Sequence, residues 1–464
     1  MAPLMPSRRH VYDYDLISIG SGAGGGVAAH ILARQGKKVA IVEDHVVGGE
    51  CPNFGCVPTK ALLHAAELYR NAQKAKDFGI KVSALNFNYA TIKKWKDQAV
   101  RNTGVEEGER AYAADGIAVI KGHAHFISPH ELSVGGRRFT AKKFVVATGT
   151  SQFVPPIEGL EDAGYLTYRE AIDLTKPLKK VLVIGGGSIG CEFTQLFATF
   201  GANVIQVEFA SRLLAREDPE IGDLVQAVFE QLLGAEVHTD SEVVKVEKKA
   251  RKKIVHFRTG DKTSQVTVDE IMVATGKVPR TDLGLENAGV KYNRLGIKVD
   301  NYMQTTNKNI YAAGDVIGNF MFTHIASYQS RLAAHNMFAP KNERVKASYH
   351  AVPRVVFIDP EVAAVGYSED ELKAMNVKYK SAIAPVSIIG RSNVTDSDIG
   401  FVKIIASPKD VVLGASIVAP RAGEMIHELG LAVQNHLKLK AITDTIHAFP
   451  TWSEAIRVAA NKLQ

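Results

Sequence analysis

Cysteine is scarce in this chain, with only three among 464 residues. So few cysteines exclude a framework of structural disulfides and favour a reducing compartment, so that the cytoplasm is the expected location. Two of the three, Cys51 and Cys56, are separated by only four residues, in the run Gly48 to Lys60. This concentration indicates a specific use for the pair.

Long apolar runs are also missing, since none approaches the ~18 residues that a membrane span requires. Met1–His10 contains Arg8 and Arg9 but no apolar stretch before Tyr12, so we expect a short loose arm there and no secretory signal. A hydrophobic content of 46% with 23% charged residues is typical of soluble globular proteins and allows several cores. The length predicts about three domains.

A net charge of +7 raises the question of a nucleic-acid partner. The densest basic stretch, Lys245 to Lys253, lies between two apolar runs, Glu242–Val246 and Ile254–Phe257. No aromatic cluster or recognition helix accompanies it, so the pattern predicts the solvated tip of a β-hairpin and no nucleic-acid binding.

An internal repeat organises the chain. An apolar strand, Asp15–Gly20, leads into a G-x-G-x-x-G turn, a helical pattern follows, and a second strand, Lys38–Glu43, ends in a carboxylate. The same unit recurs 165 residues later, beginning with the strand Lys180–Gly185. Two complete strand–turn–helix–strand units predict two dinucleotide-binding folds. The paired positions are Gly20, Gly22, Gly25 and Glu43 in the first unit and Gly185, Gly187, Gly190 and Glu208 in the second.

The residue types in each unit suit a dinucleotide. The glycines let the backbone approach a pyrophosphate, and the helix N-terminus offers free N–H groups to it. Glu43 and Glu208 are expected to bind ribose hydroxyls. A carboxylate repels a 2′-phosphate, so Glu208 favours NAD over NADP. Arg212 lies nearby, but Leu213 and Leu214 indicate a new turn in which Arg212 faces elsewhere.

Two later segments resemble the closing strands of these folds. Lys143–Gly149 and Glu270–Gly276 both end in Ala-Thr-Gly, and Ile310–Asp315 ends in Gly-Asp. The chain is therefore expected to leave the first dinucleotide domain, build the second and return. The predicted domains are 1–150 with 277–346, then 151–276, and finally 347–464.

The C-terminal region carries no nucleotide motif. Its alternating apolar runs predict antiparallel strands, and two helical patterns follow, so we expect an α+β domain. The expected strands are Val355–Ile358, Glu361–Gly366, Phe401–Ile405 and Val411–Val418, and the expected helices are Glu424–His436 and Ser453–Leu463.

Taken in order, the cysteine run, the two dinucleotide units, the repeated Ala-Thr-Gly and the Gly-Asp strand resemble the class I pyridine nucleotide–disulfide oxidoreductases, which include dihydrolipoamide dehydrogenase, glutathione reductase and mercuric reductase. The resemblance covers roughly Tyr14 to Ala460. It implies an α/β fold with FAD on the first unit, NAD(P)H on the second and a homodimer built through the C-terminal domain.

The resemblance also implies a role for individual residues. Hydride from the nicotinamide would reduce FAD, and the electrons would pass to a Cys51–Cys56 disulfide and on to an acceptor. Cys51 matches the interchange thiol, Cys56 the thiol beside the flavin, and Lys60 with Glu192 an ion pair between flavin and nicotinamide. The matching cofactor positions are Thr148, Gly149, Asp315, His324 and Ala326 for FAD, and Gly276 for NAD.

Physical chemistry supports the roles of the cysteines. Pro58 to Leu62 begins a helix, so Cys56 is expected just before a helix N-terminus and near Lys60, where the pKa of a thiol falls. The alternatives are a zinc half-site, which needs two more ligands, and a structural bridge, which would add little stability across so short a loop. No metal site is expected. Cys191, next to Gly190, is expected to be a small buried residue with no redox role.

The sequence departs from the family near its end. Dihydrolipoamide dehydrogenases carry His-Ala-His-Pro-Thr-x-Ser-Glu, but here Phe449 stands at the second histidine, the acid–base residue. Glu454, which would orient it, is retained. Phenylalanine cannot transfer a proton, so turnover of a dithiol should be impaired. His447 is one candidate to replace the missing acid–base histidine. The alternative for His447 is a structural role near the interface.

Two further differences bear on the acceptor. Glu50 stands before Cys51 where lipoamide dehydrogenases usually carry threonine, which points towards the mercuric reductase-like branch. Yet the sequence ends Ala460–Gln464 without the second cysteine pair of mercuric reductases. The leading hypothesis is thus an NAD(P)H-linked FAD disulfide oxidoreductase with an acceptor that needs no histidine acid, such as a metal ion, a quinone or an oxidised electrophile. The alternatives are a genuine dihydrolipoamide dehydrogenase and a non-catalytic flavoprotein redox sensor.

Overall fold

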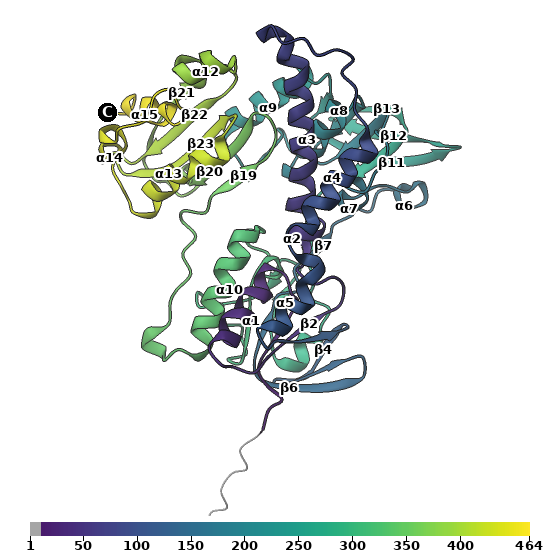
Figure 1. Ribbon diagram of the computed structural model, residues 1–464, viewed down its shortest axis with the longest axis vertical. Coiled ribbons are helices and arrows are strands. Elements are labelled where there is room, and N and C mark those ends of the chain that lie inside the picture. The colour runs from purple at the N-terminus through teal and green to yellow at the C-terminus, as the bar shows by residue number, and fades with distance from the viewer. Residues whose placement is uncertain (1–10) are drawn as a thin grey trace, which may run out of the picture. The chain divides into compact units, whose positions relative to one another are not determined.

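The computed structural model describes residues 11–464 and divides them into two compact units (Figure 1). The expected arm at Met1–His10 lies outside the described residues. The first unit contains the segments up to Pro58, Asp97–Phe153 and Lys277–Ala347. The second unit contains Thr59–Lys96, Val154–Gly276 and Ser348–Gln464.

A mixed sheet forms the centre of the first unit. Its parallel part has the order β3-β2-β1-β6-β18, and β5 and β4 extend it as an antiparallel hairpin along the first half of the long strand β6. The strands are β1 (Tyr14–Ile19), β2 (Val39–Glu43), β3 (Ala118–Lys121), β4 (Ala124–Ser128), β5 (Glu131–Val134), β6 (Arg137–Val146) and β18 (Ile310–Ala312). Two small ribbons pair β7 (Thr150–Gln152) with β15 (Lys277–Pro279) and β16 (Tyr292–Asn293) with β17 (Gly296–Ile297).

Alternation along the strands fills a core on each face of this sheet. Leu16 packs with the helices α1 (Ala23–Arg34) and α10 (Thr323–Phe338), whereas its neighbour Ile17 packs with Phe126 on the opposite face. Successive strand residues point to opposite faces, so a continuous apolar strand can serve two cores. Figure 1 shows α1 and α10 side by side, and the Ala28 N–H donates to Ser330 Oγ between them at 2.9 Å.

The second dinucleotide fold lies in the second unit. Its parallel sheet has the order β10-β9-β8-β14, and a three-stranded antiparallel sheet, β11-β12-β13, follows β10 in the chain. The strands are β8 (Lys180–Ile184), β9 (Asn203–Val207), β10 (Glu236–His238), β11 (Ser241–Lys249), β12 (Lys252–Thr259), β13 (Lys262–Val268) and β14 (Glu270–Val273). The helices are α6 (Leu160–Ala163), α7 (Tyr168–Ala171), α8 (Ser188–Thr199) and α9 (Pro219–Gln231).

The C-terminal part of the second unit is a five-stranded antiparallel sheet of order β19-β20-β23-β22-β21 with helices packed against it. The predicted α+β character is thus confirmed. The strands are β19 (Arg354–Val356), β20 (Glu361–Gly366), β21 (Lys380–Pro385), β22 (Phe401–Ala406) and β23 (Val412–Ala419). The helices are α11 (Glu369–Ala374), α12 (Gly390–Thr395), α13 (Ala422–Gln434), α14 (Leu439–Asp444) and α15 (Glu454–Asn461).

A helical segment lies between β2 and β3, and the sequence patterns predicted only the start of one of its helices. It consists of α2 (Glu50–Asn53), α3 (Cys56–Lys74), α4 (Tyr89–Arg101) and α5 (Gly108–Ala114). The long helix α3 begins at Cys56 itself, so the expectation that Cys56 precedes the helix N-terminus was wrong by a residue or two. Helix boundaries shift by this much when only the first apolar repeat marks them.

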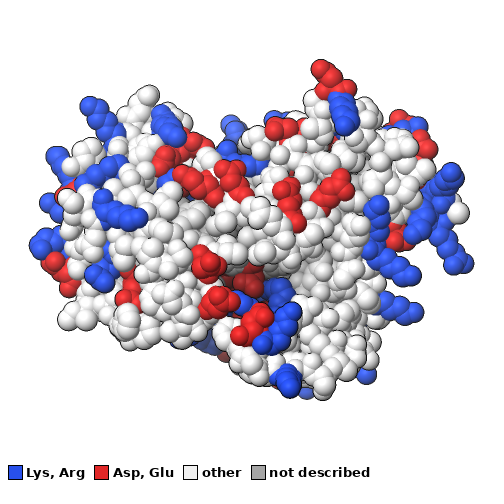
Figure 2. Space-filling view, turned by 90° about the horizontal axis from the view of Figure 1, so that it is seen from above, with Lys and Arg blue, Asp and Glu red and all other residues white. Residues whose placement is uncertain are grey.

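The basic stretch forms a hairpin, as predicted. β11 and β12 pair antiparallel from Lys249 opposite Lys252, and the turn between them is Ala250–Arg251. Lys and Arg side chains crowd the right edge of the view in Figure 2, on the side to which β11 to β13 extend in Figure 1. Lys252 and Lys253 form ion pairs with Asp269 and Glu270, at the start of β14, so part of this charge is neutralised within the second unit. No helix among residues 11–464 is both long and apolar enough to span a bilayer.

Candidate active site

Cys51 and Cys56 lie on two adjoining helices of the chain. Cys51 is the second residue of α2 and Cys56 is the first of α3, with Phe54 and Gly55 between the helices. Both side chains are thiols in this structure. Cys56 Sγ lies 3.6 Å from Thr323 Oγ1, at the first residue of α10. A hydrogen bond with Cys56, together with burial, raises the pKa of the Cys51 thiol far above its ordinary value.

The segment that leads to the cysteines packs directly on the first glycine turn. A Cβ atom at Gly49 would lie 2.5 Å from Gly22 Cα, so the two backbones are in close contact and only glycine fits at position 49. The Gly48 N–H donates to Ser21 Oγ at 3.0 Å, and the Ser21 hydroxyl donates to Glu43 Oε2 at 2.6 Å. One serine therefore connects the cysteine segment to the carboxylate at the end of β2.

The two strand-end acids occupy equivalent positions in their folds. Glu43 accepts hydrogen bonds from the N–H groups of Ser21 at 3.0 Å and His45 at 2.9 Å. Glu208 accepts from the N–H of Gly186 and from that of Ala210 at 2.7 Å. Each acid is thus held beside its glycine turn by backbone N–H groups, the position in which such an acid binds a ribose diol.

Both glycine turns fit a dinucleotide. Gly22 and Gly187 are the N-cap residues of α1 and α8, and neither helix start is capped by a side chain. A Cβ at Gly187 would meet no atom within 4 Å, and one at Gly22 would meet only Gly49 Cα, at 3.6 Å. Free N–H groups facing open space are what a pyrophosphate binds. By contrast, a Cβ at Gly25 or Gly190 would collide with the carbonyl of Gly20 or Gly185, so these glycines serve helix–strand packing.

Asp315 lies at the start of a short 3₁₀ helix, Asp315–Ile317, three residues beyond β18. Burial raises the pKa of its carboxyl, although the charge of Lys277 and a hydrogen bond from Thr150 Oγ1 at 3.5 Å oppose that effect. A Cβ at Gly24 of α1 would lie 2.8 Å from the Ala313 carbonyl oxygen, so this strand end and α1 are in close contact. The carboxyl therefore lies beside the first dinucleotide turn, as the prediction of a flavin contact requires.

The remaining predicted cofactor residues occupy strand ends or the start of α10. Ala326 is buried with its Cβ facing Gly314, whereas His324 is exposed and stacks on Phe322 with ring centroids 5.3 Å apart. Thr148 Oγ1 donates to the Arg280 carbonyl at 2.6 Å, and the Gly149 carbonyl accepts from the Arg280 N–H at 3.0 Å. A Cβ at Gly276, in the equivalent position of the second fold, would meet no atom within 4 Å.

Lys60 and Glu192 form the predicted ion pair within the second unit. Lys60 Nζ donates to both carboxylate oxygens of Glu192, at 2.9 and 2.8 Å. The Phe357 N–H donates to Glu192 Oε1 at 3.0 Å, and Lys60 Nζ lies 4.7 Å above the Phe357 ring. Glu192 is on α8, just after the second glycine turn, and Lys60 is one helical turn after Cys56 on α3. Within the second unit, the pair thus joins α3 to α8.

His447 is held by both of its ring nitrogens. Nδ1 lies 2.9 Å from the Thr445 carbonyl and Nε2 lies 3.1 Å from Glu428 Oε1. Both ring nitrogens therefore already face partners within the chain, and this geometry favours the structural role over the catalytic one. Glu454 is buried and accepts from the Thr451 N–H at 3.3 Å. Phe449 is 75% exposed.

Three features of the site had no signal in the sequence patterns. Thr323 touches Cys56, Phe357 positions Glu192, and Gly49 brings the cysteine segment against Gly22. The predicted burial of Cys191 is confirmed, since it is fully buried, and burial raises the pKa of its thiol. Within residues 11–464, no three His, Cys, Asp or Glu side chains gather as they would around a metal ion.

Two dinucleotide folds, a vicinal cysteine pair packed on the first of them and a separate α+β part define the class of flavin- and nicotinamide-dependent disulfide oxidoreductases. The family model described as pyridine nucleotide-disulphide oxidoreductase matches residues 14–330, and its dimerisation domain matches residues 352–460. The chain belongs to this family, so it is an FAD-dependent oxidoreductase that acts on sulfur groups and uses a pyridine nucleotide.

Known relatives carry several activities. The chain is 35% identical to a mercuric reductase of Bacillus cereus, over 97% of this chain and 71% of the relative. It is 36% identical to a dihydrolipoyl dehydrogenase of Thermus scotoductus, over 97% of both chains. Among solved structures it is similar to the HOCl-induced flavoprotein disulfide reductase RclA of Escherichia coli, with a TM-score of 0.86, 29% identity and coverage of 97% of this chain and 100% of that one. The chain is about equally identical to relatives with different activities. The identities therefore show the family of this chain but not its electron acceptor.

Proposed function

We propose that this protein is an NADH-linked reductase whose Cys51–Cys56 pair passes electrons to a small acceptor that needs no histidine acid. The observation that carries the proposal is the contact between the cysteine segment and the first glycine turn, where Gly49 and Gly22 touch. A dinucleotide bound on that turn would lie beside the segment that carries the two thiols. The proposed domains are 1–150 with 277–346 for FAD, 151–276 for the nicotinamide cofactor and 347–464 for dimerisation.

The residues of the first unit fit FAD. The free N–H groups at the start of α1 would hold the pyrophosphate, Glu43 the adenosine ribose and Asp315 the ribityl chain. When bound, the flavin would supply two-electron transfer between the nicotinamide and the cysteine pair. The protein's own part is to place and protonate the thiols.

The two thiols are the reduced form of the pair. Oxidation to the Cys51–Cys56 disulfide releases two electrons and two protons, and a nucleophilic attack by Cys51 needs its thiolate. The raised pKa of Cys51 keeps it protonated near neutral pH, so a base must take its proton when it reacts. Thr323, in contact with Cys56, can accept or donate a hydrogen bond as that proton moves.

Cofactor choice is proposed to favour NADH. Glu208 already faces the second glycine turn, and its negative charge would repel a 2′-phosphate while it accepts from a 2′-hydroxyl. By their match to the family, Lys60 and Glu192 are proposed to serve the nicotinamide site, with Lys60 Nζ held by both carboxylate oxygens of Glu192.

The missing base limits the acceptor. Phe449 replaces the family's acid–base histidine, and His447 is held by Thr445 and Glu428. An acceptor that takes electrons without needing a proton from this position suits the site, such as a metal ion, a quinone or an oxidised electrophile. Two of the similar RclA structures are Cu(II) complexes, which supports a metal ion among the candidates.

A second candidate is a genuine dihydrolipoyl dehydrogenase. The 36% identity to such an enzyme and the retained Lys60, Glu192 and Glu454 favour it, whereas Phe449 counts against it. A non-catalytic redox sensor would need none of these catalytic side chains, so their retention counts against that alternative.

We further propose a homodimer formed through the C-terminal domain. The family's dimerisation domain covers residues 352–460, and the loop before α15 exposes Ile446 by 97% and Phe449 by 75%. Apolar side chains this exposed are typical of a surface that is covered in the assembly.

The central test is anaerobic reduction of the purified flavoprotein with NADH. A long-wavelength charge-transfer band is expected from a Cys56 thiolate beside the flavin, and Cys56→Ser should lack it while Cys191→Ser keeps it. Absence of the band in flavin-loaded wild-type protein would refute the proposal. Steady-state assays with lipoamide, Hg²⁺, Cu²⁺ and quinones would then rank the acceptors, and brisk turnover of lipoamide would select the second candidate.

A further inference from the structure

Arg212 is the cation that comes nearest in sequence to the ribose acid of the second fold, four residues after Glu208. The segment that carries it closes over the glycine turn, because the Leu214 N–H donates to the Gly186 carbonyl at 2.9 Å. A Cβ at Gly186 would lie 2.7 Å from Leu213 Cδ2 and 2.9 Å from Glu208 Cγ. Arg212 therefore flanks the pocket in which an adenosine ribose would lie.

An arginine in this region is what a 2′-phosphate requires, because guanidinium and phosphate form charge-assisted hydrogen bonds. Here the guanidinium is directed elsewhere. Arg212 Nη2 donates to the carbonyls of Ala215 and Glu217, both at 3.3 Å, and pairs with Asp370 Oδ2 at 3.1 Å. Its side chain is only 24% exposed.

The stem of Arg212 is confined as well. A Cβ at Gly222 of α9 would lie 3.1 Å from Arg212 Cβ and 3.3 Å from Arg212 Cδ, so the helix leaves just enough room for it. Arg212 Nε is buried and has no hydrogen-bond partner among the described residues. The side chain thus contacts Asp370 and the two carbonyls through Nη2 while Nε has no partner among the described residues.

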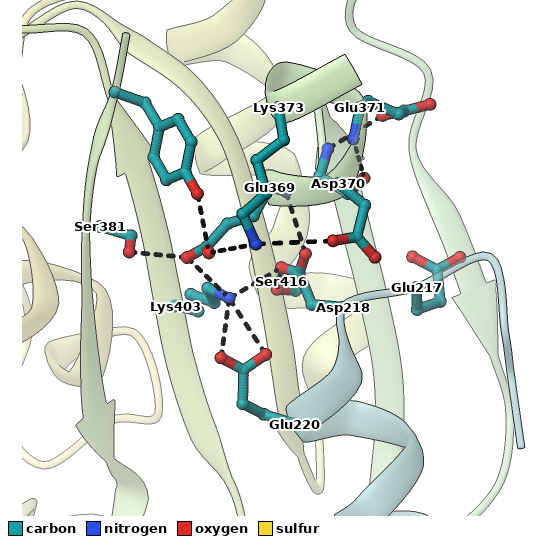
Figure 3. Close-up of polar contacts among 12 residues, drawn as sticks. Glu217, Asp218, Glu220, Glu369, Asp370, Glu371, Lys373, Ser381, Lys403 and Ser416 are labelled. Atoms are coloured by element: carbon teal, nitrogen blue, oxygen red, sulfur yellow. Dashed lines mark hydrogen bonds and ion pairs between the residues drawn. The ribbon is translucent and has the colours of Figure 1, made fainter. Parts of the chain in front are cut away.

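Asp370 belongs to α11 of the C-terminal part, and a buried charge cluster fixes that helix to the second dinucleotide fold (Figure 3). At its centre Lys403 Nζ, on a side chain that is 1% exposed, lies 3.4 Å from Asp218 and 3.0 Å from both Glu220 and Glu369. Asp218 Oδ1 also accepts the Glu369 N–H, at 3.1 Å. The residue next to Asp370 is therefore bonded to the segment just after Arg212.

A second ion pair fixes the carbonyl side of the contact. Arg354 on β19 binds both carboxylate oxygens of Glu217, each at 3.0 Å, and the Glu217 carbonyl is one of the acceptors of Arg212. One acceptor of Arg212, Glu217, is thus fixed by a strand of the C-terminal part. Arg216, in contrast, is exposed.

We infer that Asp370 is a specificity-determining residue that favours NADH over NADPH by holding Arg212 away from the 2′ position of the cofactor. This inference rests on the proposed NADH-linked function, and it assigns part of the cofactor choice to a residue outside the dinucleotide fold. Release of Arg212 would place a guanidinium beside Glu208, where it would offset the carboxylate and bind a 2′-phosphate.

The test is the ratio of kcat/KM for NADPH to kcat/KM for NADH in the flavin-loaded enzyme. Asp370→Ala should raise this ratio about tenfold, the effect of one charge-assisted contact to phosphate. Asp370→Glu, which restores the carboxylate, should return it most of the way to the wild-type value. Asp444→Ala, which removes an exposed ion-paired aspartate of α14, is the matched control and should leave it unchanged.

Double variants identify the cation. The gain should vanish in Asp370→Ala with Arg212→Ala and persist in Asp370→Ala with Arg216→Ala. A ratio within about twofold of wild type in Asp370→Ala, or a gain that survives removal of Arg212, would overturn the inference. If Asp370→Ala does not fold, Asp370→Asn removes the charge at constant size and should shift the ratio in the same direction.

Calorimetric binding of adenosine 2′,5′-bisphosphate and 5′-AMP separates this inference from the proposed function, because it needs no turnover. Tighter binding of the bisphosphate alone in Asp370→Ala supports the inference even where the wild-type enzyme shows no charge-transfer band. Equal binding in wild type and variant refutes the inference even where the enzyme is an active NADH-linked reductase.

Discussion

Replacing Lys403 with methionine should destabilise the protein strongly at neutral pH. The change keeps the length and apolar stem of the side chain and removes an ammonium that contacts Asp218, Glu220 and Glu369 at once. Asp218 is 3% exposed and Glu369 is 18% exposed, so both would lose their nearest cation, and among the described residues Glu369 would keep only Lys373, at 3.6 Å. Loss of one partner from a buried ion pair costs about 3–5 kcal/mol.

The pKa of Glu369 gives an independent magnitude. Burial alone would raise it, but hydrogen bonds from Ser381 and Lys403 and the charge of Lys403 lower it from the ordinary 4.5 to about 2. A difference of that size corresponds to at most about 3 kcal/mol of stability at pH 7. Solvent reaches Glu369 in part and Ser381 contributes to the shift, so we assign about 1–2 kcal/mol to Lys403 at this carboxylate. The buried Asp218 would add to this loss, which brings the total to about 3 kcal/mol.

The pH dependence follows from the sign of the shift. A carboxyl whose pKa is lowered by folding stabilises the wild type fully above its unfolded value of 4.5, and that contribution disappears as the pH falls towards about 2. In Lys403→Met, protonation of the carboxylates in the same range removes their repulsion. The difference between the two proteins should therefore be largest at pH 7 and shrink below about pH 4.5.

Urea denaturation followed by circular dichroism at several pH values would measure the free energy of unfolding of both proteins. Lys440→Met is the matched control, because Lys440 pairs with Asp444 on the exposed face of α14 and should contribute under about 1 kcal/mol. A loss in Lys403→Met no larger than in the control, or a loss that stays constant as the pH falls from 7 to about 2, would refute the electrostatic reasoning.

Three further outcomes are expected. Phe449→His should raise the rate of dihydrolipoamide oxidation about 10²-fold by supplying a proton acceptor, measured by NADH formation; a gain equal to that of Phe449→Ala would contradict this reason. Glu192→Gln should slow reduction of the flavin by NADH about tenfold, since it breaks a charge-assisted contact with Lys60; a wild-type rate in stopped flow would show that the pair is structural. Ser21→Ala removes two hydrogen bonds of about 1 kcal/mol each, so FAD release, followed by flavin fluorescence, should accelerate several-fold; an unchanged rate would show that Glu43 is held well enough without Ser21.

The dinucleotide folds could be predicted because their signals are local. Gly20, Gly25 and Glu43 lie within one strand–turn–helix–strand unit. The same unit recurs from Gly185, so each copy supports the interpretation of the other. The start of α3 was predicted to within two residues for the same reason. The antiparallel strands of the C-terminal part were found where they alternate, whereas β21, with its half-exposed small residues, was missed.

The long-range contacts of the site could not be predicted. Thr323 reaches Cys56 across 267 positions of sequence, and Phe357 reaches Glu192 across 165. No spacing rule connects such residues, because their meeting depends on how whole elements pack. The charge cluster at Lys403 is the clearest case, since a lone lysine in the apolar strand Phe401–Ala406 gives no sign of the acids that surround it.

The duplicated folds differ at the residue after their first glycine, and that difference bears on how long each ligand stays. Ser21 ties Glu43 to the Gly48 N–H, whereas Gly186 offers no hydroxyl, and Leu213 fills the space beside it. A nucleotide leaving the first fold would disturb the acid, the serine and the cysteine segment together, but one leaving the second would disturb only a turn. We expect the first fold to retain its ligand through many catalytic cycles and the second to exchange its ligand in each cycle. The same architecture therefore serves once for a tightly bound ligand and once for an exchanging one.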